Sequence, residues 1–308
     1  MPIKKIKSLP HRVSEAWKRK TSKFVLPGMD GLTGHDLWEI YSAGIINGTF
    51  STRASAVAFS FFLALFPFLL FVLNLIPYVS FIDDFQLKFL VFMDSLLPPT
   101  TSEFFGDIFL DIASTPRAGL LSVSFILSIL FMTNGVNAIF TGFEFSYHTN
   151  TNRSIIRQYF VAVVISILMA LLLLMTVIMV IFLTYALDDL QNMGLVTVGG
   201  IPAKIVQYIA LIILVYIVVA TLYYYGTKEG RLARFFSIGA TFTTLLIMLT
   251  TYFFNLYIQN FSQYNELYGS IGALLVLMIY IWLNSNILLL GFELNASLIK
   301  MKKKSYNL

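Results

Sequence analysis

Long apolar stretches separated by short polar segments run through most of the chain. Six of these stretches contain at most one charged residue each and exceed the roughly 20 residues that a helix needs to cross a bilayer. Because backbone groups cannot bond to water inside hydrocarbon, each is expected to cross the membrane as an α-helix. The pattern predicts an all-α, polytopic membrane helix bundle, a single domain over residues 35–299. The spans are expected at about 54–76, 119–142, 158–187, 203–225, 235–260 and 268–299.

The two ends of the chain have a different, basic composition. Residues 1–34 are expected to form a basic cytoplasmic arm, as a short amphipathic helix on an anionic lipid surface or as a solvated tail. A capping-box pattern from Thr33 to Asp36 predicts a second, interfacial helix that ends near Gly48. Residues 300–308 are expected to form a basic cytoplasmic tail.

The segment between the first two spans breaks the pattern because charged residues recur within it. Two apolar-periodic pieces separated by Pro98-Pro99 predict an amphipathic helical hairpin over 81–114, either on the outer face or partly inside the membrane. In its second piece, Glu103, Asp107 and Asp111 follow one another at i, i+4 and i+8, so their carboxylates share one helical face. That outer acidic face either attracts cations or is simply solvated.

Composition supports a membrane protein, and the charge distribution orients it. Only 12% of the 308 residues are charged and the mean hydropathy is +0.79, whereas a soluble domain is typically about 25% charged. If both termini are cytoplasmic, all but three of the 21 Lys and Arg residues lie in inner segments; the exceptions are Lys88, Arg117 and Lys204. The positive-inside rule therefore predicts cytoplasmic N and C termini.

Polar residues inside the predicted spans are candidates for a functional site, because an amide or ionisable group in hydrocarbon needs a partner. By their spacing along a helix, the polar residues of the last span fall on two adjacent helical faces, and the polar residues of the second span fall on one stripe. Together they are expected to line one polar cavity that opens inward, with helix-to-helix hydrogen bonding as the alternative for the second span. The set comprises Asn284, Asn286, Glu293 and Asn295 in the last span and Asn134 and Asn137 in the second.

Two further residues of the spans bear on mechanism. Glu293 lies two turns before Lys300, near the expected inner boundary of the membrane. It is a candidate either for a structural ion pair with Arg53 or Lys300 or for coupling a proton or substrate to transport. Pro67, in the middle of the first span, removes one backbone hydrogen bond and is a candidate hinge, with packing of a kinked helix as the alternative.

Segments in the first and last spans resemble one known family. Residues 53–59 (RASAVAF) and 65–67 (LFP) resemble the opening helix of the YihY / virulence factor BrkB family. Residues 268–273 (YGSIGA) and 290–296 (LGFELNA) resemble its closing helix, and the resemblance extends over about 37–299. It implies six spanning helices in a bacterial cytoplasmic (inner) membrane. The family's function is poorly defined: members are described as transporter candidates, are linked to serum resistance in a pathogen, and were long mislabelled as a ribonuclease.

The sequence shows no pattern for an enzyme or a cofactor. Metal-dependent hydrolysis of RNA needs clustered ligands, and the three histidines, His11, His35 and His148, lie in separate polar segments. There is no Gly-rich phosphate loop, no nucleophile elbow, no basic groove with interleaved aromatics and no cysteine. We expect no ribonuclease or other catalytic activity, no metal, no cofactor and no nucleic acid partner.

The leading hypothesis is a transporter that moves an unidentified solute, ion or lipid by passive or proton-linked conformational change. It rests on the buried polar residues and the mid-helix proline. The alternative is a non-transporting membrane scaffold or envelope-organising protein that binds lipid or partner proteins. In both cases membrane lipids, anionic at the cytoplasmic face, are expected partners, whereas the sequence predicts neither the substrate nor the oligomeric state.

Overall fold

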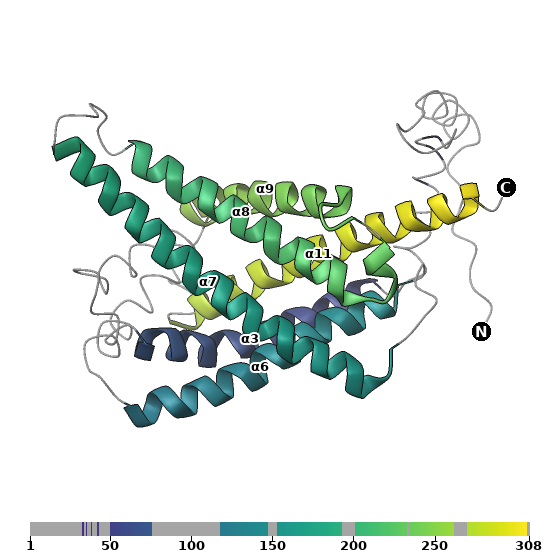
Figure 1. The fold of residues 1–308 in the computed structure, drawn as a ribbon, viewed down its shortest axis with the longest axis horizontal. Helices are drawn as coiled ribbons and strands as arrows, with labels where there is room; N and C mark the ends of the chain where they lie inside the picture. The colour runs from purple at the N-terminus through teal and green to yellow at the C-terminus, as the bar shows by residue number, and fades with distance from the viewer. Residues whose placement is uncertain are drawn as a thin grey trace.

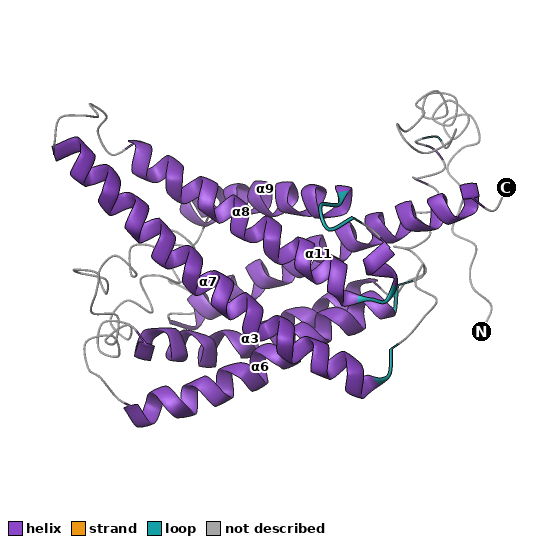
Figure 2. Cartoon of the chain, in the orientation of Figure 1, coloured by secondary structure: helices purple, strands orange, loops and turns teal. Residues whose placement is uncertain are grey.

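The computed structural model describes residues 50–75, 118–146, 153–192, 201–232, 234–261 and 270–306, together with four single positions between 33 and 42. Within these ranges the chain forms α-helices and one short 3-10 turn (Figure 2). The elements in chain order are α3 (Phe50–Leu75), α6 (Ala118–Glu144), α7 (Ile155–Asn192), α8 (Ile201–Gly226), η2 (Glu229–Leu232), α9 (Ile238–Phe261) and α11 (Ser270–Tyr306) (Figure 1).

Each of these six α-helices contains a segment long and apolar enough to cross a membrane, which confirms the prediction of an all-α bundle with six spanning helices. Apart from Thr33, the basic arm lies outside the described residues, as does the hairpin over 81–114 with its acidic face. Of the interfacial helix expected after Thr33, only single positions are described.

Local sequence signals explain several helix ends. Ser237 precedes α9, and its hydroxyl accepts the N–H of Ala240, which is the usual N-cap bond. Pro202 lies in the first turn of α8, where its missing N–H removes no helical hydrogen bond. At the other end of the chain, α11 continues through the lysines to Tyr306, so the expected basic tail begins as helix.

The six α-helices pack as a closed ring. Each contacts its neighbour in the chain, in the order α3, α6, α7, α8, α9 and α11, and α11 returns to pack against α3 (Figure 1). Side-chain bonds tie the starts of α3, α7 and α9 to the ends of α6 and α8 and to the C-terminal half of α11, so successive helices run in opposite directions. We call this end of the bundle the closed end.

Aromatic side chains fill the middle of the bundle at the closed end, where α6 also contacts α8 and α11 across the ring. The ring of Phe143 stacks on Phe292 with centroids 4.0 Å apart and meets Tyr223 edge-on at 5.6 Å. All three side chains are buried. Gly226 permits the crossing of α6 and α8, because a Cβ there would lie only 2.5 Å from Phe143 Cδ2.

Two helices are longer than a bilayer requires. The 38 residues of α7 extend about 57 Å at 1.5 Å per residue, well beyond the ~30 Å hydrocarbon core. In Figure 1, α7 runs diagonally across the bundle. The C-terminal part of α11 extends past the other helices at the closed end (Figure 1).

Candidate functional site: a buried ion pair beside a central cavity

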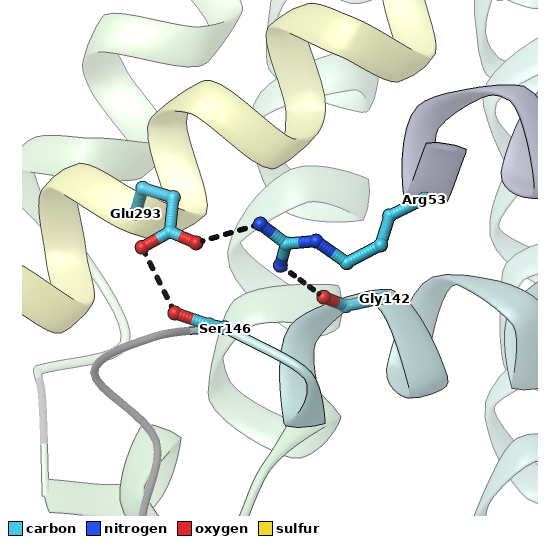
Figure 3. A network of polar contacts seen from close by, with 4 residues as sticks. All are labelled: Arg53, Gly142, Ser146 and Glu293. Atoms are coloured by element: carbon cyan, nitrogen blue, oxygen red, sulfur yellow. Dashed lines mark hydrogen bonds and ion pairs between the residues drawn. The ribbon is translucent and has the colours of Figure 1, made fainter. Parts of the chain in front are cut away.

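An ion pair between α3 and α11 lies at the closed end. Arg53 Nη2 is 3.0 Å from Glu293 Oε1, and the exposed fractions of the two side chains are 6% and 0% (Figure 3). Burial removes the hydration of both charged groups, which costs free energy unless hydrogen bonds to the protein replace it. The surroundings of the pair therefore decide whether it is stable.

Gly142 in the last turn of α6 and Ser146 just after the helix supply most of those hydrogen bonds. Arg53 Nη1 donates to the carbonyl of Gly142 at 2.7 Å, and Ser146 Oγ donates to Glu293 Oε2 at 2.9 Å (Figure 3). The last carbonyls of a helix have no partner within it, and a cation there interacts favourably with the helix dipole. Arg53, Gly142, Ser146 and Glu293, the closed-end network, thus join α3, α6 and α11. Arg53 Nε is buried without a hydrogen-bond partner among the described residues.

A second set of buried polar groups joins α8, α9 and α11. The hydroxyl of Tyr223 donates to the Leu288 carbonyl at 2.7 Å and lies 2.6 Å from Thr243 Oγ1. Because the single hydroxyl hydrogen of Tyr223 is committed to the carbonyl, Thr243 is the donor in the second bond. Gly291 makes this packing possible, since a Cβ there would overlap Thr243 Oγ1.

Asn295 binds the C-terminal half of α11 to the start of α9. Its Oδ1 accepts the N–H of Gly239 at 3.0 Å, and its Nδ2 donates to Ser237 Oγ at 2.7 Å. The N–H groups in the first turn of a helix have no helical partner, so Asn295 satisfies one of them. The asparagine is buried, and its bonds explain why an amide is tolerated there.

Arg153 plays a comparable part between α7 and α8. Its Nη1 donates to the carbonyl of Tyr225 in the last turn of α8 at 2.7 Å, and its backbone N–H donates to Glu144 Oε1 at 3.2 Å. Burial lowers the pKa of the Arg153 guanidinium below its ordinary value, and the nearby Glu144 carboxylate opposes that shift. A guanidinium stays protonated in proteins, so Arg153 remains a cation at the end of α8.

A cavity of about 360 Å³ lies within the ring of helices, next to the closed end. Residues of α3, α6, α8, α9 and α11 line it, and none of them is charged. The lining includes Val57, Ile139 and Leu222, which lie within about one turn of Arg53, Gly142 and Tyr223 in their helices. It also includes Leu288, whose carbonyl accepts from Tyr223. The polar residues of the lining are Tyr280, Asn284 and Ser285.

The structure distributes the polar residues of the last span over several places. Asn284 lines the cavity. Glu293 and Asn295 lie in the buried networks at the closed end, and Asn286 donates to the carbonyl of Trp282 in its own helix. Glu293 pairs with Arg53, one of its two expected partners. A shared functional role for the set stays a prediction.

The polar residues of the second span face α7. Gln158 Nε2 donates to Asn137 Oδ1 and to Thr141 Oγ1, both at 3.0 Å, and the hydroxyl of Tyr159 lies 3.5 Å from Asn134 Oδ1. These contacts have the geometry of helix-to-helix hydrogen bonding. Gln158 was not among the polar residues predicted to matter, although its position at the start of the third span, opposite the end of the second, is a usable signal.

The structure also bears on the expectations for Pro67 and for a metal site. α3 is continuous through Pro67, whose carbonyl accepts a hydrogen bond from Ser128 Oγ on α6. The role of Pro67 as a hinge stays a prediction.

Among the described residues, no group of three or more His, Cys, Asp or Glu side chains is placed to hold a metal ion.

Fold and site together define the class as an integral membrane protein with six candidate spanning helices arranged in a ring. A model of the family described as "Virulence factor BrkB" matches residues 44–307, and the chain belongs to this family. This agrees with the resemblance carried by the first and last spans.

Two relatives illustrate the range of the family. The chain is 28% identical over 257 residues to YfkH of Bacillus subtilis (strain 168), a ribonuclease-like protein by name; the match covers 82% of this chain and 91% of that relative. It is 40% identical over 58 residues to the UPF0761 membrane protein PSHAa0171 of Pseudoalteromonas translucida (strain TAC 125), a segment covering 19% of each chain. No solved structure was found to match this chain.

Proposed function

We propose that this protein is a transporter of the bacterial cytoplasmic membrane whose central cavity holds the substrate. The observation that carries the proposal is the cavity of about 360 Å³ inside a ring of helices, one end of which is filled by buried aromatic and ion-paired side chains. A bundle that serves only as a scaffold gains nothing from such a void, because close packing stabilises membrane helices.

The closed end is the expected gate, and α11 is its common element. The closed-end network joins α11 to α3 and α6, whereas Tyr223 and Thr243 join α11 to α8 and α9. A movement of α11 would break both sets of bonds and connect the cavity to the closed side. Glu293 is the proposed trigger, since its protonation or a substrate contact would weaken its attraction to Arg53.

Positive charge supports a cytoplasmic orientation of the closed end. Arg153, Arg157, Lys228 and Arg231 lie near one another there, and the lysines of α11 extend from the same end. Under the positive-inside rule, this end faces the cytoplasm and both termini are cytoplasmic.

Labelling of single cysteines tests access to the cavity, and the chain offers a clean background because it has no cysteine. Ser285→Cys places a thiol in the cavity lining. We expect a membrane-impermeant maleimide to reach it from the outer side, and to reach it from the cytoplasmic side at least about tenfold faster once Glu293→Gln breaks the ion pair. The tenfold factor assumes that the closed-end network stabilises the closed state by more than ~1.4 kcal/mol.

Two matched variants control this experiment. Thr133→Cys places a buried thiol between α6 and α7, outside the cavity lining, and is expected to stay unlabelled from both sides. Arg157→Gln removes an exposed arginine at the closed end and should leave the labelling of Ser285→Cys unchanged. If Ser285→Cys reacts from neither side in either background, the transporter proposal fails and the scaffold alternative is favoured.

A further inference from the structure

The surface that the cavity presents to an occupant is almost entirely apolar. Most of the lining consists of aliphatic and aromatic side chains such as Phe61, Val218 and Leu277, and no lining residue is charged. A polar or charged group that enters such surroundings loses its bonds to water and finds no replacement, which is strongly unfavourable. The cavity therefore favours an apolar occupant over a polar solute or an ion.

The three polar residues of the lining use their polar atoms elsewhere. Asn284 Nδ2 donates to the carbonyl of Tyr280 at 2.8 Å, and Asn284 Oδ1 is buried. Ser285 Oγ donates to the carbonyl of Ile281 at 2.8 Å. The hydroxyl of Tyr280 donates to Thr251 Oγ1 at 2.8 Å, because Thr251 gives its own hydrogen to a carbonyl of its own helix. An occupant gains no hydrogen bond from any of these donors.

The cavity lies at the depth of the membrane. All of its lining residues fall inside the segments of the helices that are long and apolar enough to cross a bilayer. At this depth the surrounding medium is lipid hydrocarbon. An engineered apolar cavity of about 150 Å³ stays free of water and takes up benzene, with its six carbons. By the same measure, a cavity of about 360 Å³ has room for roughly a dozen carbon atoms.

The cavity is elongated along the helices. Its lining extends over residues 277–288 of α11, about 16 Å at 1.5 Å per residue. The lining on α3 (57–65) and on α8 (214–222) extends about 12 Å each. An extended chain fills a space of this shape along its length, whereas a compact molecule would leave part of it empty.

The closed end offers no passage to a polar headgroup. The lining residues Val57, Leu222 and Leu288 are all buried there, and the packed rings of Phe143 and Tyr223 lie in the same part of the bundle. The cavity as a whole is nevertheless open rather than sealed. Its opening therefore lies away from the closed end. A lipid chain would enter with its terminal methyl group first and leave its headgroup outside.

From these observations we propose that the cavity binds one acyl chain of a membrane phospholipid, with the terminal methyl group towards the closed end and the headgroup outside the cavity. Phospholipid is the source because it supplies the hydrocarbon around the spans. This ligand class deepens the proposed transport function and rests on it for the statement that the occupant is the transported substrate. Binding itself does not depend on transport.

A photoaffinity experiment tests the occupant and its direction. The purified full-length protein is placed in nanodiscs that contain phosphatidylethanolamine with a diazirine either near the terminal methyl group or near the ester of one acyl chain. Adducts are mapped by peptide mass spectrometry after irradiation. Leu222 and Leu288 are informative because both are buried, so lipid outside the bundle does not reach them. We expect the methyl-end probe to label these two residues, and the ester-end probe to label Phe61 or residues farther from the closed end.

Two valines give a matched pair of variants. Val218→Phe places a ring in the cavity, and we expect labelling of Leu222 and Leu288 to fall at least about tenfold, the factor for excluding roughly two methylene groups from an apolar site. Val164→Phe makes the same change at an exposed position of α7 outside the lining, and labelling should remain. If Val218→Phe does not fold, the comparison of the two probes on the unmodified protein still decides.

Several results would overturn the proposal. They are the absence of adducts at Leu222 and Leu288, equal labelling of both residues by the two probes, or labelling that survives Val218→Phe. Stronger labelling by a free fatty acid with the same methyl-end diazirine would contradict phospholipid as the source.

Failure here is separable from failure of the transport proposal. Adducts at Leu222 and Leu288 without maleimide labelling of Ser285→Cys would support the lipid site and make it a static one. Accessible Ser285→Cys without these adducts would overturn the lipid site and leave a transporter with a different substrate class.

Discussion

At the residue scale, Arg53 combines two tasks that need a guanidinium. One nitrogen pairs with Glu293 while the other donates to the Gly142 carbonyl, so a single side chain neutralises a buried carboxylate and completes the end of α6. The planar fork of arginine suits two partners in fixed directions, whereas lysine presents a single point charge. This explains why the pair is tolerated in a fully buried position.

Removing one partner of this pair should cost far more than removing both. We expect Arg53→Met to lower the free energy of unfolding by about 3–5 kcal/mol, because Glu293 is left buried and charged. The double variant Arg53→Met/Glu293→Met should recover most of that loss. Chemical unfolding in detergent micelles, followed by circular dichroism, measures both. The exposed Arg157→Met serves as control, and a double variant that loses as much stability as Arg53→Met alone, or more, would contradict the coupling.

The residues of the site differ in how much the sequence reveals about them. A charge inside an apolar stretch must find a partner, so Glu293, Arg53 and their pairing could be considered from the pattern alone. Ser146 and the Gly142 carbonyl could not, because a short hydroxyl and a backbone group carry no sequence pattern. Their roles follow from where α6 ends, which depends on tertiary contacts.

At the scale of elements, close approach of α9 and α11 depends on small residues. Apolar surface gives little drive for helix association in lipid, so contact and interhelical hydrogen bonds must hold the pair together. Gly291 faces Thr243, and Gly239 lies against Asn295 and the Gly291 carbonyl. These glycines set how near the two helices lie and therefore whether Tyr223 can reach its partners.

Enlarging Gly291 should separate the two helices. We expect Gly291→Ala to destabilise the protein by at least about 1–3 kcal/mol, because the new methyl group overlaps Thr243 Oγ1 and crowds the Tyr223 hydroxyl. Thermal unfolding in detergent measures the effect. Gly119→Ala is the matched control, since nothing lies within 4 Å of its Cβ position and alanine favours a helix. Equal effects of the two substitutions would show that steric overlap is not the cause.

The helices were predictable, but their arrangement was not. Length and apolarity suffice to predict six spans, because lipid allows few other structures for such segments. The closure of the ring by α11 against α3 has no comparable signal, since spans that are apolar on all sides do not reveal which face meets which neighbour. The extension of α11 through its lysines to Tyr306 was also missed, because lysine is a good helix former in water.

At the scale of the whole molecule, the two ends of the bundle differ in packing and charge. The closed end combines buried networks with a cluster of cations at the α6–α7 and α8–α9 connections, and the cavity lies towards the middle of the bundle. A transporter that alternates between two states needs such an asymmetry, because only one side of its substrate site is open at a time. Which side is closed depends on the orientation in the membrane.

Orientation can be measured with two single cysteines at opposite ends of α7. Ser154→Cys lies exposed just before α7 at the closed end, and Asn192→Cys ends α7 at the other side. Membrane proteins retain Lys and Arg on the cytoplasmic side, and such residues cluster at the closed end. We therefore expect an impermeant maleimide added to right-side-out vesicles to label Asn192→Cys alone. Permeabilisation should then expose Ser154→Cys, which shows that its thiol is reactive. The reverse order of labelling would place the closed end outside, and Glu293 would then respond to the external medium rather than to the cytoplasm.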